Sequence, residues 1–106
     1  MRIIKHILSN DGHDFGKHLV LVPLDDTDNP RHAIVNADDF YYLMDNCCSK
    51  YWKLDHHNTI VVWGSKGQRL CAVKRLIVNA ISGQGVKIRN GNPLDLRRHN
   101  LEIYEE

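Results

Sequence analysis

The chain has 106 residues, of which 42% are hydrophobic and 25% are charged, with a formal net charge of +1. This length supports one domain with a modest core, and the composition is that of a folded globular protein rather than a disordered one. No apolar run approaches the roughly 18–20 residues needed to span a bilayer, and the N-terminal segment breaks after Leu8 rather than forming a secretory signal. We therefore expect a single domain over residues 1–106, located in the cytoplasm of a host cell and without a membrane partner.

The small net charge conceals an uneven distribution. Residues 1–63 carry six Lys/Arg against nine Asp/Glu, a balance of −3, whereas residues 64–106 carry eight against four, a balance of +4. A basic half is typical of a phosphate-binding surface, and the alternative is a solvated basic face on a nearly neutral protein.

The first half of the chain predicts strands followed by a helix. Short β-branched or leucine-rich runs indicate three strands, over residues 3–8, 18–24 and 33–35. Asn36 is placed to cap a helix whose first turn carries Asp38 and Asp39, where the helix dipole favours negative charge. The apolar residues that recur at helical spacing should form its buried stripe, namely Phe40, Leu43, Met44 and Cys47.

The second half predicts a hairpin, a further strand and helix, and a C-terminal unit. Strands over residues 51–54 and 59–63 flank a turn at residues 56–58. A glycine-containing turn at residues 64–67 leads to a strand over 69–73 and a helix to about residue 81. A strand over residues 86–89 and a turn at residues 90–92 then precede a short helix from Leu94 or Asp95 to about Asn100. The expected fold class is α+β, a small mixed domain with short strands.

Residues 86–104, with the sequence VKIRNGNPLDLRRHNLEIY, form the most informative stretch. They resemble the motif of HNH endonucleases of the phage and homing type, a family of ββα-metal nucleases that act on DNA. The motif residues that carry the resemblance are Asn90, Gly91, Asn92, Asp95 and Asn100. The resemblance implies a degenerate ββα-metal-like unit at the C-terminus.

The resemblance extends upstream with less specific residues. Residues 32–43, followed by Trp52, are similar to the AP2-like DNA-binding modules that precede HNH motifs in phage proteins. Residues 72–81 resemble the strand-to-helix segment just before the motif, although Lys74 stands where the family usually has a histidine. About 70 residues, from 32 to 104, follow the family pattern.

The residues that open the motif have lost the chemistry of the family. An Asp-His or Asn-His pair normally helps bind a divalent cation and removes a proton from the attacking water, but this chain has Lys87 and Ile88. A protonated lysine cannot ligate a hard cation, and isoleucine has no lone pair to act as a base. The family's second metal ligand lies beyond Glu106, at which the sequence ends. We therefore expect no catalytic residue, no metal and no cofactor.

The other motif residues have roles independent of catalysis. An Asn-Gly pair favours a tight turn with positive φ, and the resemblance implies that Arg97 and Asn100 hold the turn in place. Arg89 and Arg98 have no obvious role in folding and are the better candidates for contact with a partner. The full set of candidate nucleic-acid-binding residues is Lys74, Arg75, Lys87, Arg89, Arg97 and Arg98.

Neither the histidines nor the cysteines predict another site. His13 and His18 have the spacing of a zinc-binding pair, but the second pair that a zinc site needs is missing. Three cysteines, two of them adjacent, argue against a disulfide framework. We interpret the seven histidines as surface or turn residues.

Three functions are compatible with these features. The first is a non-catalytic DNA-binding protein of a phage or mobile element, derived from an HNH endonuclease. The second is a phage protein that inhibits a host defence protein, such as a CRISPR effector, by occupying the site that holds DNA. The acidic residues that favour this anti-CRISPR role are Asp25, Asp26, Asp28, Asp38 and Asp39. The third is a divergent nicking endonuclease with substitute ligands.

Overall fold

The computed structural model describes residues 3–9, 17–46, 49–63 and 70–106. These residues form β1 (Lys5–Leu8), β2 (His18–Pro23), β3 (His32–Asn36), α1 (Ala37–Asn46), β4 (Lys53–Leu54), β5 (Ile60–Trp63), β6 (Leu70–Ala72), α2 (Val73–Val78), β7 (Gln84–Ile88), the 3₁₀ turn η1 (Arg98–Asn100) and β8 (Leu101–Glu105). The mixed α+β class expected from the sequence is confirmed. Among the described residues, no helix has the length and apolar character needed to cross a membrane.

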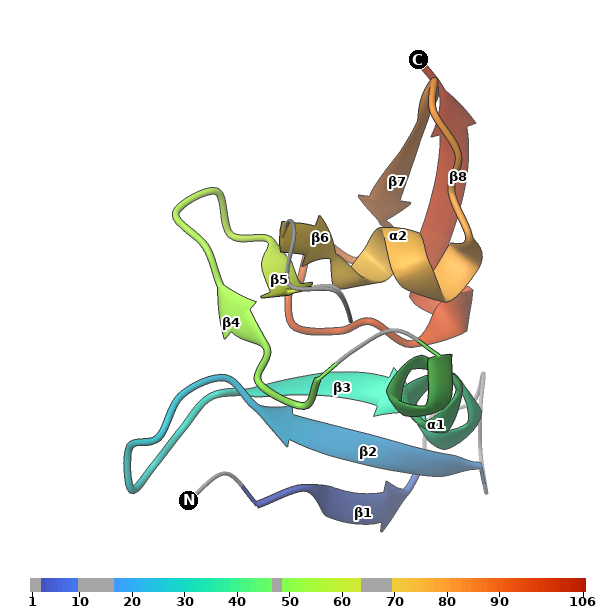
Figure 1. The fold of residues 1–106 in the computed structure, drawn as a ribbon. Coiled ribbons are helices and arrows are strands. Elements are labelled where there is room, and N and C mark those ends of the chain that lie inside the picture. Colours follow the sequence, from blue (N-terminus) through green and yellow to red (C-terminus); the bar gives the residue numbers. More distant parts are fainter. Residues whose placement is uncertain (1–2, 10–16, 47–48, 64–69) are drawn as a thin grey trace.

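The strands form three small antiparallel sheets (Figure 1). The first contains β1, β2 and β3, the second contains β4, β5 and β6, and the third is the hairpin of β7 and β8. A segment of the C-terminal motif also joins the first sheet, because Ile34 of β3 forms a parallel bridge with Asp95. The Ile34 amide donates to the Leu94 carbonyl at 2.8 Å, and the Leu96 amide donates to the Ile34 carbonyl at 2.8 Å. The motif is therefore anchored to the N-terminal sheet.

A single cluster of buried apolar side chains connects the sheets and both helices. Helix α1 contributes Phe40 and Leu43, which are 5% and 1% exposed, and the ring of Phe40 lies 6.0 Å from that of the buried Trp52. Met44 packs at the edge of this cluster. The predicted buried stripe is thus confirmed for these helical residues, whereas Cys47 lies outside the described residues.

The prediction for the C-terminal motif is wrong in two respects. The helix expected from Leu94 or Asp95 to Asn100 is not formed, because residues 93–94 lie in a turn, Asp95 pairs with Ile34 of β3 and only the single turn η1 follows. Strand β8, which was not expected, then pairs with β7 from Ile88 opposite Leu101 to Gln84 opposite Glu105. Pairing with β3 has overridden the local helical preference. The C-terminal unit is therefore a β-hairpin with the motif in its long loop.

The remaining predicted elements correspond closely to observed ones. The turn at residues 56–58 connects β4 and β5, and the strand of residues 60–63 pairs with both β4 and β6. The helix expected to reach about residue 81 ends earlier, where Asn79 adopts a left-handed conformation with φ of 55°. The predicted turn at residues 64–67 lies outside the described residues.

Candidate nucleic-acid interface

The motif loop, residues 89–100, is closed by Asn90 and Asn100. The Oδ1 of Asn100 accepts from the backbone amide of Asn90 at 3.1 Å, and its Nδ2 donates to the Asn90 Oδ1 at 3.0 Å and to the Asp95 carbonyl at 2.9 Å. The side chain needs both a donor and an acceptor for these bonds, which an amide provides. Asn100 is 4% exposed, so it acts within the loop and offers little surface to a partner.

Asn90, Gly91 and Asn92 form the turn at the start of this loop. Gly91 has φ of 77°, a left-handed conformation that glycine adopts without strain. The Asn90 Oδ1 accepts from the Asn92 amide at 2.9 Å, and the Asn92 Oδ1 accepts from the Leu94 amide at 3.0 Å. The tight turn with positive φ that the Asn-Gly pair predicted is confirmed.

A buried ion pair joins Asp95 and Arg97 inside the loop. The Nε of Arg97 donates to Asp95 Oδ1 at 2.8 Å and its Nη2 donates to Asp95 Oδ2 at 2.7 Å, while Asn90 Nδ2 donates to the same Oδ2 at 3.0 Å. Burial opposes ionisation of this carboxyl, but the hydrogen bonds and charge of Arg97 hold the pKa of Asp95 below its ordinary value. Because the Arg97 side chain is only 14% exposed, we exclude it from the interface.

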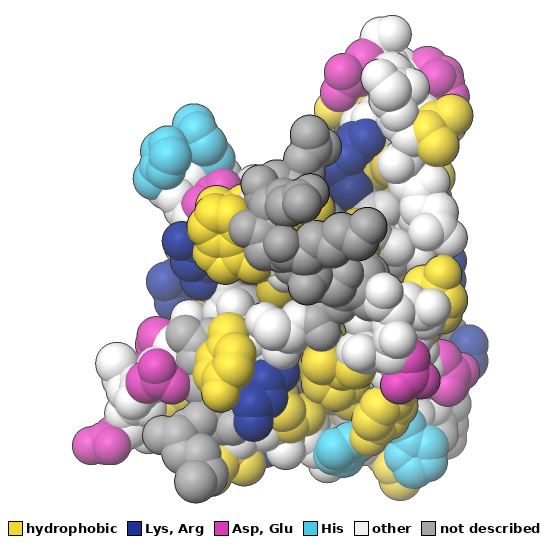
Figure 2. Space-filling model, in the orientation of Figure 1, with side chains coloured by type: hydrophobic (Ala, Val, Ile, Leu, Met, Phe, Trp, Pro, Cys, Tyr) yellow, Lys and Arg dark blue, Asp and Glu magenta, His cyan; other side chains and the backbone are white. Residues whose placement is uncertain are grey.

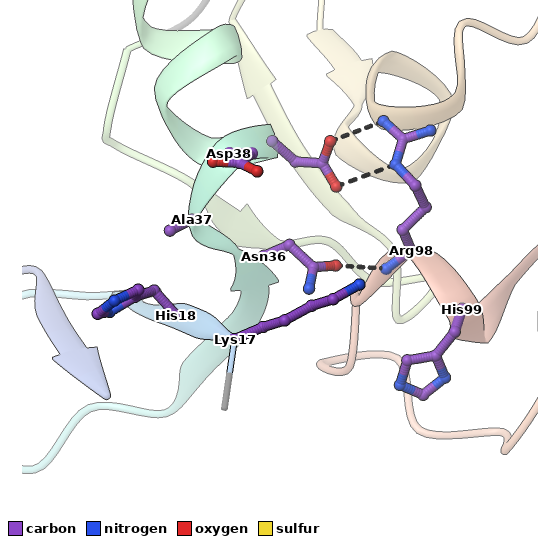
Figure 3. Close-up of a pocket in the computed structure, with 8 residues that line it drawn as sticks. Lys17, His18, Asn36, Ala37, Asp38, Arg98 and His99 are labelled. Atoms are coloured by element: carbon purple, nitrogen blue, oxygen red, sulfur yellow. Dashed lines mark hydrogen bonds and ion pairs between the residues drawn. The ribbon is translucent and has the colours of Figure 1, made fainter. Parts of the chain in front are cut away.

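Arg98 connects the motif loop to the rest of the fold (Figure 3). Its backbone amide donates to Asn36 Oδ1 at 2.8 Å, and its Nη2 donates to Asp39 Oδ1 at 2.6 Å and to the Ile77 carbonyl at 2.9 Å. Arg98 therefore makes contacts within the fold that the sequence did not predict, and we assign its side chain, which is 57% exposed, to these contacts and not to the interface. The role expected for Asn36 also changes, because its Oδ1 accepts from Arg98 and no described hydrogen bond joins its side chain to an amide of α1.

Arg75 also serves the fold. Its Nη1 donates to the Gln84 carbonyl and its Nη2 donates to the Ile81 carbonyl at 3.0 Å, so the guanidinium spans the turn between α2 and β7. A side chain that satisfies two backbone carbonyls in this way is held in place. We therefore exclude Arg75 from the interface together with Arg97.

The three remaining basic candidates lie around one surface, which we call the hairpin groove. Lys74 of α2 and Lys87 of β7 line this groove of about 500 Å³. Arg89 follows the end of β7 and lies beside the groove, because its Nε is 3.8 Å from Oε2 of Glu102, which lines the groove. The other residues that line the groove are Val86, Ile88, Glu102 and Tyr104. Figure 2 shows a small dark-blue patch of basic side chains beside β7.

The charges of the hairpin groove are incompletely neutralised. Among the described residues, no carboxylate lies within ion-pair distance of the Lys74 or Lys87 ammonium group. Arg89 Nε lies 3.8 Å from Glu102 Oε2, and both side chains are about half exposed. Such exposed pairs are weak and are screened by salt, so Arg89 remains able to contact a phosphate.

Two residues of the groove, Glu102 and Tyr104, are absent from the sequence prediction because β8 was not expected. The register places Glu102 opposite Lys87 and Tyr104 opposite Gly85. The signal for this strand is weak, since residues 101–105 do not alternate regularly and the residues with high β propensity are the adjacent Ile103 and Tyr104.

The resemblance places the metal ligand and the base of HNH endonucleases at residues 87 and 88, which are a lysine and an isoleucine in this chain. Lys87 lines the groove, and Ile88 is partly buried against the core. Among the residues that the structure describes, no group of three or more His, Cys, Asp or Glu side chains is arranged to hold a metal ion. His18 is exposed at the start of β2, and His13 lies outside the described residues.

No protein-family model, curated protein or solved structure matches this chain. The likeness to HNH endonucleases therefore rests on the motif residues themselves. In the structure these residues close the loop and pair it with β3, and the neighbouring Arg98 connects it to Asp39 of α1. The surface that this scaffold presents is the hairpin groove.

Proposed function

We propose that the protein is a non-catalytic nucleic-acid-binding protein of phage or mobile-element type, derived from an HNH endonuclease, and that it binds DNA at the hairpin groove. The observation that carries this proposal is the pair of lysines, Lys74 and Lys87, which line one groove without a carboxylate partner among the described residues. Ammonium groups in this state attract phosphates and displace the counterions that surround DNA. Arg89 extends the basic surface along the hairpin.

The non-catalytic part of the proposal is supported by what occupies the positions of the lost site. A metal ion beside residue 87 would meet the positive charges of Lys87 and Lys74, and the carboxylate of Glu102, which lines the same groove, already lies 3.8 Å from Arg89. The neighbouring Ile88 packs against the core and cannot accept a proton from water. The residues that remain from the motif therefore maintain the shape of a binding surface.

Fluorescence anisotropy with labelled single-stranded and duplex DNA tests this function. The variant Lys87→Gln/Arg89→Gln removes two charges from the groove, and Lys50→Gln/Lys53→Gln removes two exposed charges near β4 as the matched control. We expect weaker binding by the groove variant, with the slope of log K against log salt reduced by about 0.9 per lost contact on duplex and about 0.7 on single strands. The control should bind as the wild type does.

Two results would contradict the proposal. Failure of the wild-type protein to bind either DNA at low salt would reject the nucleic-acid-binding function. An unchanged affinity and salt slope in the groove variant, with loss of binding in the Lys50→Gln/Lys53→Gln control, would place the interface elsewhere. Circular dichroism of both variants checks that the fold is retained.

A second candidate function is inhibition of a host defence protein by an acidic surface. The turn between β2 and β3 projects from the first sheet (Figure 1), and it carries the exposed Asp26 and Asp28. Asp38 is also exposed, but Asp39 is paired with Arg98 and 12% exposed, so the acidic surface is smaller than the sequence predicted. Acidic side chains can engage a basic DNA channel.

A pull-down from host lysate, with and without nuclease treatment, separates the two functions. For the inhibitor, a protein partner should survive nuclease treatment and be lost with Asp26→Lys/Asp28→Lys, while Lys87→Gln/Arg89→Gln has no effect. For the DNA-binding protein, recovery should be limited to nucleic acid and should depend on the groove lysines. If nuclease treatment abolishes recovery of every partner, inhibition of a host protein by direct binding is excluded.

A further inference from the structure

Tyr104 forms an aromatic surface at the hairpin groove. It lies opposite Gly85 in the β7–β8 register, and its side chain is positioned over the backbone of that glycine. A Cβ atom at residue 85 would lie 2.3 Å from the Tyr104 Cζ and 2.7 Å from its Cε2, so the ring can take this position only beside a glycine. Tyr104 nevertheless remains 49% exposed. One side of the ring is therefore supported by β7 while much of the side chain faces solvent.

Tyr104 and the two lysines, Lys74 and Lys87, belong to the same groove. Residues 85 and 87 are two positions apart on β7 and point to the same side, so Tyr104, lying over Gly85, is roughly 7 Å along the strand from Lys87. Lys74 of α2 lines the groove as well. The one carboxylate among its lining residues, Glu102, lies near Arg89, which offsets part of its charge.

We propose that the hairpin groove binds single-stranded nucleic acid in preference to duplex, with Tyr104 stacking on an unpaired base and Lys74 and Lys87 contacting the adjacent phosphates. This inference rests on the proposed function and specifies its ligand. An aromatic ring beside basic side chains is the combination with which proteins hold single strands, because every unpaired base has a flat face. In a duplex, those faces are covered by neighbouring base pairs and are not accessible to Tyr104.

Anisotropy titrations with labelled single-stranded and duplex DNA of equal length, at one salt concentration, test this preference. We expect the wild-type protein to bind the single strand at least tenfold more tightly than the duplex. Tyr104→Leu should weaken single-strand binding by roughly 5- to 150-fold, the range for loss of one stacking contact. Tyr104→Phe and Tyr104→Trp keep an aromatic face and should retain most of the affinity. Tyr42→Leu, at a tyrosine of α1 that is 53% exposed, is the control and should bind as the wild type does.

The outcomes distinguish this inference from the proposed function. Equal or tighter binding of the duplex, with no effect of Tyr104→Leu, would overturn the single-strand preference and leave DNA binding intact. No binding of either DNA would overturn both. If thermal melts show that Tyr104→Leu does not fold, the ratio of the wild-type affinities for single-stranded and duplex DNA still tests the preference. The affinity of Tyr104→Phe tests the need for an aromatic ring, and neither measurement uses Tyr104→Leu. Nuclease-resistant capture of a protein, without DNA binding, would assign the groove to a protein partner.

Discussion

Asp95 lies almost fully buried inside the motif loop, where it accepts hydrogen bonds from the side chains of Arg97 and Asn90. The folded chain holds its pKa below the ordinary value of 3.8, because these bonds and the charge of Arg97 outweigh the effect of burial. In the unfolded chain the carboxyl should titrate at about 3.9. The stabilisation from the ionised form is therefore fully present above that value and is lost as the pH falls through the lower folded pKa.

Replacing Asp95 by asparagine should destabilise the protein by roughly 3 kcal/mol at neutral pH, because Arg97 loses its charged partner in a buried setting. The difference in free energy of unfolding between wild type and Asp95→Asn should shrink as the pH falls below 3.8. Urea unfolding of both proteins at a series of pH values measures this difference in the free energy of unfolding. Asp45→Asn, at an exposed position of α1, is the control. A difference that stays constant down to the acid transition would show that the charge of Asp95 does not stabilise the loop.

The basic residues show how far the sequence determines the site. Local charge density selected Lys74 and Lys87 as candidates, but it could not separate them from Arg75 and Arg98, whose side chains bond within the fold. The partners of Arg98 are Asn36 and Asp39, about 60 residues earlier in the chain, and a contact over that separation depends on tertiary structure. Half of the candidate cations are consequently engaged within the fold.

Helix α1 provides the element that packs the first sheet against the core. Its spacing predicted the buried side, and Leu43 is 1% exposed there while Tyr42, the preceding residue, is 53% exposed. Leu43→Ala should lower the free energy of unfolding by roughly 2–5 kcal/mol, because it removes buried methyl groups and leaves a cavity. Tyr42→Ala is the matched control and should change it by less than about 0.5 kcal/mol. Denaturant unfolding gives both values, and a loss below about 0.5 kcal/mol for Leu43→Ala would mean that the helix is oriented differently.

The elements that could be predicted are those with a clear apolar pattern. Helix α1 buries one side at helical spacing, and strands β2 and β5 are short apolar runs that are largely buried, so their residue patterns indicate their type. Residues 94–100 have no such pattern, and their conformation depends on hydrogen bonds to Ile34 and Asn36 of β3. Strand β8 exposes four of its five residues, which weakens the hydrophobic signal that marks a strand.

At the scale of the whole molecule, the motif loop connects parts of the chain that are distant in sequence. Its start is bonded to η1, its middle is paired with β3, and Arg98 reaches α1 and the C-terminal end of α2. In an HNH endonuclease the corresponding loop supports a metal site, according to the resemblance. In this chain the loop is continuous with β7, and Lys87 of β7 lies beside Lys74 of α2. Under the function that we propose, binding and cutting are separate properties, and this chain keeps residues for binding alone.

This separation predicts that the purified protein, supplied with Mg²⁺ or Mn²⁺, shifts DNA in a gel without nicking supercoiled plasmid above background. The reason is chemical, since Lys87 repels a cation and Ile88 offers no lone pair to a water molecule. Conversion of supercoiled to open-circular plasmid over time measures nicking directly. Metal-dependent nicking that co-purifies with the protein through successive columns, disappears with Asn100→Ala and persists in Tyr42→Ala would refute the prediction. It would also identify the chain as an endonuclease with substitute ligands.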